Sequence, residues 1–128
     1  MAWNLFEDVE IGTDLEVSDP ITPPSYGIHA TSRHLKFELF LQFTNDGGSD
    51  ITVTVEVYHL HDWGDSAPTF KLSNTPFNNL TVSVPKNATV RVCYTGDMVA
   101  NQFRLGLKAS TGTVTASAHV YFAPGHVR

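Results

Sequence analysis

The sequence predicts an all-β protein: a single-domain antiparallel β-sandwich or jelly roll. Apolar and polar residues alternate with a period of two in one segment after another, and Gly, Asn, Asp and Pro separate these segments. No segment keeps a helical period for more than a turn or two. A strand with one apolar face must bury this face against another layer, so we expect two packed sheets.

The N-terminal residues 1–33 are expected to form an arm that belongs to the same domain as the sandwich core at 34–128. The arm contains one predicted strand, around residues 9–17, and a proline-rich stretch that favours a loop or a sheet edge. A terminal arm is poorly ordered unless it docks. We expect this one to dock onto a partner, because it carries three large apolar residues close together: Trp3, Leu5 and Phe6.

Two strands are predicted over residues 34–44 and 51–60, where the apolar positions alternate with Lys, Glu, Gln and Thr. Phe40 is the one apolar residue on the polar face of the first strand. The run between them, Asn-Asp-Gly-Gly-Ser-Asp at 45–50, favours a turn because Asn and Asp form Asx turns and Gly accepts positive φ. We therefore expect a β-hairpin.

The second half of the chain continues the alternation, with Pro85-Lys86-Asn87 and the turn around Gly112 as interruptions. The last two strands are expected to form a second hairpin. The predicted strands of this half cover residues 80–84, 89–94, 103–110 and 113–122.

The closing segment has a strand that ends in Ala-Ser (Phe103–Ser110), a short glycine turn and a Thr- and Ala-rich strand that ends in an aromatic residue (Thr113–Phe122). It resembles the closing hairpin of small β-sandwich structural proteins of tailed phages, especially the head decoration or cement proteins. The resemblance covers less than the last third of the chain and carries over no binding residue. It implies a protein on the outer capsid surface, often trimeric, that clamps neighbouring subunits of the major capsid protein.

The charge and the apolar content of the chain restrict the classes of partner that we expect. The net charge of -5 and the pI of about 5.5 disfavour binding to a phosphate backbone. We therefore expect no nucleic-acid partner. We also expect no membrane partner, because no apolar stretch is long enough to span a bilayer. Neither a basic segment nor an apolar run typical of a signal peptide opens the chain, so we expect assembly into the virion in the host cytoplasm. Cys93 is the only cysteine, which excludes an internal disulfide.

His59, His61 and Asp62 are the weak candidates for a metal site. Residues i and i+2 of a strand share a face, so the two imidazoles can meet one ion, with an oxygen from Asp62 or Asp65. The alternative is that the histidines end a strand and the aspartates shape a turn. No spacing defines a third ligand, so we expect no metal and no cofactor. The motifs of hydrolases, phosphate loops and zinc proteases are missing, so we expect no enzyme.

The loop aromatics are the remaining candidates. Trp63 and Phe77 lie between the predicted strands, and Tyr26 lies in the arm. Any one of these aromatics is explained by a lid that folds back over an open end of the sandwich. Taken together they also fit a protein interface, where large aromatics concentrate binding energy, so Trp63 and Phe77 join the arm residues as interface candidates. The leading hypothesis is a capsid decoration protein that forms a homo-oligomer, possibly a trimer, on the outer surface of the virion. The alternative is a carbohydrate-binding module or a tail receptor-binding component that stacks sugars on the loop aromatics.

Overall fold

The computed structural model confirms the predicted all-β sandwich. It describes residues 2–22, 35–60, 69–71, 80–97 and 102–124, and every regular element within these ranges is a strand. These described residues contain no helix that is long and apolar enough to cross a membrane. The strands are β1 (Ala2–Ile11), β2 (Glu16–Val17), β3 (Leu35–Asn45), β4 (Ile51–Leu60), β5 (Thr69–Lys71), β6 (Leu80–Val84), β7 (Ala88–Asp97), β8 (Gln102–Ala109) and β9 (Val114–Pro124).

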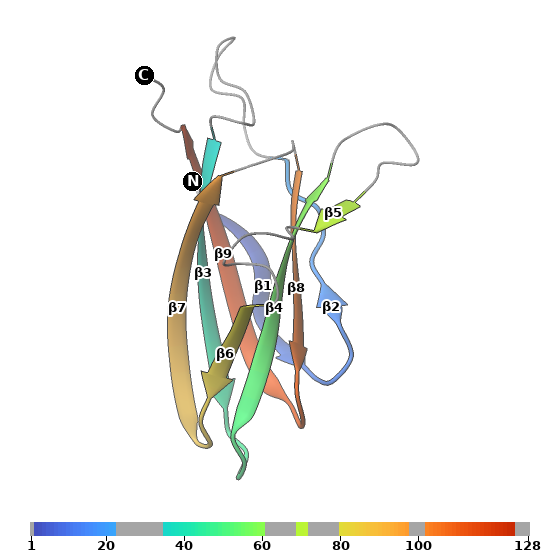
Figure 1. The fold of residues 1–128 in the computed structure, drawn as a ribbon. Coiled ribbons are helices and arrows are strands. Elements are labelled where there is room, and N and C mark those ends of the chain that lie inside the picture. Colours follow the sequence, from blue (N-terminus) through green and yellow to red (C-terminus); the bar gives the residue numbers. More distant parts are fainter. Residues whose placement is uncertain (1, 23–34, 61–68, 72–79, 98–101, 125–128) are drawn as a thin grey trace.

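The strands form two antiparallel sheets that pack face to face (Figure 1). Sheet A has the order β1-β9-β3-β7, and sheet B has the order β2-β8-β4. The far edge of β4 pairs with β6 along one half and with the short β5 along the other. The chain changes sheet at every step along the sequence except from β4 to β5 and from β5 to β6, which stay in sheet B. Apart from the added β5, this is the strand order of a jelly roll.

Both predicted hairpins are wrong. β3 and β4 are consecutive but lie in different sheets, where β3 pairs with β7 and β9 and β4 pairs with β8. β8 and β9 are separated in the same way. Each connection is therefore an arch that crosses the sandwich. An arch and a hairpin bury the same alternate residues, so the alternation by itself cannot distinguish them.

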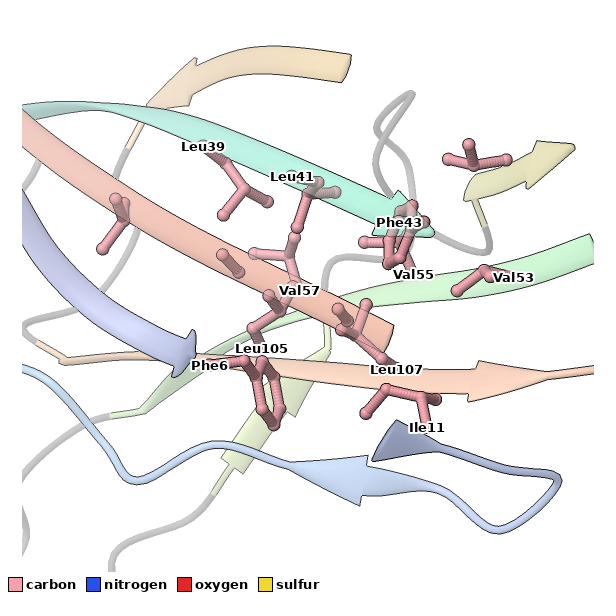
Figure 2. Close-up of a cluster of buried hydrophobic side chains, with 14 of the residues drawn as sticks. Phe6, Ile11, Leu39, Leu41, Phe43, Val53, Val55, Val57, Leu105 and Leu107 are labelled. Atoms are coloured by element: carbon pink, nitrogen blue, oxygen red, sulfur yellow. The ribbon is translucent and has the colours of Figure 1, made fainter. Parts of the chain in front are cut away.

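The core lies between the sheets (Figure 2), and it consists of the predicted apolar faces together with Phe6 and Ile21. β3 and β9 contribute the central side chains of sheet A, and β4 and β8 those of sheet B. Their fully buried aromatic and aliphatic groups supply the main favourable term in folding, because apolar surface leaves water. The largest of these side chains are Phe37, Phe43, Phe103, Ile11, Leu39, Leu105 and Leu107.

Asn45 is the buried polar residue that shapes the arch between β3 and β4. Its Oδ1 accepts a hydrogen bond from the Gly47 backbone N–H at 2.9 Å, which is the predicted Asx turn. Its amide nitrogen donates to the carbonyl oxygens of Ser49, at 2.8 Å, and Val84, at 3.1 Å. The second of these bonds ties the arch to the end of β6, so this end of the sandwich is closed by a satisfied buried amide.

The N-terminal segment differs from the predicted arm. The strand begins at Ala2 and not near residue 9, and it pairs with β9 along the edge of sheet A. Phe6 is 8% exposed and belongs to the core of this domain. The alternation misses this strand because two bulges shift its register, one between Asn4 and Phe6 and one between Phe6 and Val9.

Candidate functional site

The predicted interface residues are placed unequally. Trp3 and Leu5 are partly buried against the core, while the buried Phe6 serves this domain itself and presents no partner surface. Trp63 and Phe77, together with Tyr26, lie outside the described residues. An interface role for Trp3 and Leu5 stays a prediction.

Of the metal candidates, only the backbone of His59 lies within the described part of the chain. The backbone of His59 pairs with Phe70 on one side and with Phe103 on the other. His61 and Asp62, with Asp65, lie outside the described residues. Within the described ranges, no group of three or more His, Cys, Asp or Glu residues is placed to hold a metal ion.

The edge strand β7 is the first candidate interaction surface. It pairs with β3 over ten consecutive residue pairs without a bulge, and among the described strands β3 is its sole partner. One row of its backbone donors and acceptors therefore faces outward, as on any sheet edge. Figure 1 shows β7 at the rim of the sandwich, with the short β6 near its lower part. Consistent with this, Val90 and Val92 on its inner face are only half-buried.

The charges of β7 do not guard its open edge. Arg91 donates from Nε to Oε1 of Gln42, on the neighbouring strand β3, at 2.8 Å. Asp97 forms an ion pair with Lys36 of β3, with 3.4 Å between Oδ1 and Nζ. Both charged side chains are thus held over sheet A. Natural edge strands are commonly protected by charges, prolines or bulges, and β7 shows none of these at its outer rim.

The outer face of sheet A is the second candidate surface. Phe40 of β3 and Tyr121 of β9 are 37% and 41% exposed, and their rings meet edge to face with centroids 5.5 Å apart. A hollow of about 450 Å³ lies beside Phe40, lined also by Gln42, Arg91 and His119. A second hollow of about 390 Å³ is lined by Glu38, Phe40, His119 and Tyr121. The two hollows share Phe40 and His119, so they form one continuous surface.

His119 is oriented on this face by β1. Its Nδ1 lies 2.6 Å from Oδ1 of Asn4, and because an amide oxygen only accepts, the imidazole is the donor. Cys93 also lines the larger hollow and is exposed. Both Cys93 and His119 pair with Phe40, from opposite sides of β3, so about 10 Å separates their strands. This arrangement provides no thiol–imidazole pair of the kind that nucleophilic catalysis requires.

The outer face of sheet B carries an aromatic residue of a different kind. The Tyr58 hydroxyl donates to the Glu56 carboxylate, and its ring lies over Gly106, where an added Cβ would be 3.0 Å from it. Burial, the hydrogen bond to Glu56 and the negative charge of Glu56 raise the pKa of Tyr58 to about 12. The Tyr58 hydroxyl therefore has a hydrogen-bond partner in its own sheet, and its ring packs there. The rings of Phe40 and Tyr121, in contrast, line open hollows.

Comparison with known proteins adds no further assignment. The chain matches no protein-family model, and neither a curated protein nor a solved structure matches it. The candidate surfaces consequently rest on the geometry described above.

Sequence reasoning found one part of these surfaces and missed the others. Phe40 is visible as an apolar residue in a polar register, and that signal marks the centre of the hollowed face. Tyr121 gives a weaker signal, because a tyrosine on a polar face is common. The open edge of β7 gives none, because its position at a rim depends on strand order.

Proposed function

We propose that this chain is a structural protein of a virion, of the capsid decoration type, and that copies of it are joined through the edge strand β7. The observation that carries the proposal is the long, regular and unguarded edge of β7. An edge of this kind is a template for pairing with a strand of another chain. Pairing would also cover the half-buried Val90 and Val92 of β7, so apolar burial adds to the backbone hydrogen bonds.

Three further features support a role in a particle. Jelly rolls are common in viral capsid proteins. The net charge of -5 suits an outward surface better than one that touches the genome. The sequence of the closing strands resembles that of phage decoration proteins. In this proposal the partners are further copies of the chain and the major capsid protein.

The edge role is tested by sedimentation of the full chain over a range of concentrations. We expect the unmodified chain to associate, and Val92→Lys to shift it to the monomer, because an inward-pointing charge on an edge strand opposes strand addition. Val9→Lys is the matched control: Val9 is also half-buried, but it lies on the bulged edge β1. A two-fold β7–β7 contact predicts dimers, whereas the trimer implied by the resemblance requires a different contact.

A monomer at the highest concentration, or equal dissociation by both lysine variants, would overturn the edge role. The location is tested separately, by labelling virus particles with an antibody against the chain and viewing them by electron microscopy. We expect label on the outside of intact capsids. Particles that carry no label would contradict the decoration role, even if the free chain associates.

A further inference from the structure

We propose that the outer face of sheet A binds a short oligosaccharide in the hollows around Phe40 and Tyr121. This site differs from the predicted sugar platform, which was placed on the loop aromatics Tyr26, Trp63 and Phe77. It also goes beyond the structural role proposed above, because it concerns the face of the sheet and not the edge of β7.

The two aromatic rings form the apolar part of the site. Phe40 and Tyr121 lie on β3 and β9, the central strands of sheet A, and point away from the core. A cross-strand aromatic pair adds some stability to a sheet. These rings, however, also line open hollows, and at an interplanar angle of 82° they present faces in two directions. A sugar ring has an apolar face of C–H groups that packs on such an aromatic ring.

The polar side chains around the rings match the hydroxyl groups of a sugar. The hydrogen bond between Arg91 Nε and Gln42 Oε1 leaves the terminal guanidinium nitrogens and the Gln42 amide nitrogen as donors. The contact of His119 Nδ1 with Asn4 leaves Nε2 available, and Glu38 supplies an acceptor beside Tyr121. Among the described residues these atoms have no other hydrogen-bond partner. Side chains that already hold one another are pre-organised, which lowers the entropic cost of binding.

Other ligand classes fit the site less well. The Glu38 carboxylate and the overall negative charge disfavour a polyanion. A fatty acyl chain would cover Glu38, Gln42 and Arg91 without offering them a hydrogen bond, which is costly. The volumes of about 450 and 390 Å³ lie within the range of small-molecule sites, roughly 300 to 1,000 Å³. A neutral ligand with many hydroxyls, of two or three sugar units, satisfies all these conditions.

The probe is a printed array of hexose and N-acetylhexosamine oligosaccharides, applied to the full chain, and the best binder is then titrated by calorimetry. We expect at least one oligosaccharide to bind, and Phe40→Ala and Tyr121→Ala each to weaken its affinity about tenfold. Tyr58→Ala is the matched control, because it removes an aromatic from the outer face of sheet B, and we expect it to leave the affinity unchanged.

Cys93 supplies a second readout that does not depend on removing an aromatic. It is exposed, it lines the larger hollow, and as the only cysteine it takes a thiol label at one position. We expect the bound oligosaccharide to slow its reaction with a maleimide several-fold. Gln42→Ala should reduce this protection, since it removes a donor from the hollow while leaving the aromatic rings in place.

Three results would overturn the proposal. The first is an array without any binder. The second is binding that both aromatic variants keep, or that does not protect Cys93. The third is an association between protein chains that Phe40→Ala and Tyr121→Ala abolish while no oligosaccharide binds, because the face would then be a protein interface. The first two results do not bear on the edge of β7. The third would assign the association to the outer face, and the comparison of Val92→Lys with Val9→Lys then decides separately whether β7 takes part.

Discussion

The two edge strands of sheet A, β1 and β7, differ in how well they are protected against pairing with another strand. β1 is interrupted by two bulges and carries acidic residues, including Glu7, Asp8 and Glu10. Asp8 adopts a φ of 47°, which few residues other than glycine accept. β7 runs without interruption, and its two charges are drawn over the sheet by Gln42 and Lys36.

This difference indicates that only one edge of the sheet is prevented from pairing. A bulge re-aims the backbone groups of a strand and strengthens its twist, so another strand cannot follow it. The bulge at Asp8 is itself anchored: the Asp8 N–H donates to Ser117 Oγ at 3.1 Å, and this hydroxyl donates to Asp8 Oδ1 at 3.1 Å. The irregular backbone of β1 is thus held by specific hydrogen bonds, whereas the backbone of β7 is regular along its whole length.

The largest expected effect concerns the packing of the two edges. We expect Phe6→Ala on β1 to lower the free energy of unfolding by about 3 kcal/mol or more, because Phe6 is buried in the core. Val92→Ala on β7 should cost only about 1 kcal/mol, since Val92 is half-buried. Denaturant unfolding of the isolated variants measures both values. Equal costs would mean that β7 is packed as firmly as β1.

The anchor of the β1 bulge should have a smaller effect. Ser117→Ala removes the hydroxyl that bridges the backbone and side chain of Asp8, and we expect a loss of about 1 kcal/mol. Ser83→Ala, an exposed serine on β6, is the control and should change stability by less than about 0.5 kcal/mol. If Ser117→Ala costs no more than Ser83→Ala, the bulge does not depend on this contact.

Hydrogen exchange compares the two edges without any mutation. If copies join through β7, its outward amides should exchange more slowly as the protein concentration rises, while those of β1 should not change. Mass spectrometry of peptides from Ala88–Asp97 and Ala2–Ile11 reports this directly. A slowing confined to β1 would reverse the comparison and assign the contact to the bulged edge.

The smallest expected effect is that of the ion pair at the end of β7. Lys36 and Asp97 have side chains that are 56% and 66% exposed, so Lys36→Ala should change the unfolding free energy by less than about 0.5 kcal/mol. The variant nevertheless releases Asp97 from β3, and the released carboxylate can then guard the edge. A weaker association measured by sedimentation, with unchanged stability, would support that reading. Unchanged association would show that Asp97 has no influence on the edge.

The sequence alone determined the fold class and which side chains face inward. The side-chain direction alternates along any strand, so the alternate apolar positions of 37–43, 51–57 and 103–109 are buried whichever strand lies beside them. The Asx turn at Asn45 was also readable, because it is a contact between residues two apart. The strand in 2–11 was not, because its two bulges break the alternation.

Only the tertiary structure decided which strands are neighbours. A period-two pattern is satisfied equally by a hairpin and by an arch, and the packing of the two sheets selected the arch at 46–50 and again at 110–113. Strand order then placed β7 at a rim and brought Phe40 and Tyr121 together from positions far apart in the chain. Edges and faces arise from long-range pairing, and local patterns do not contain that information.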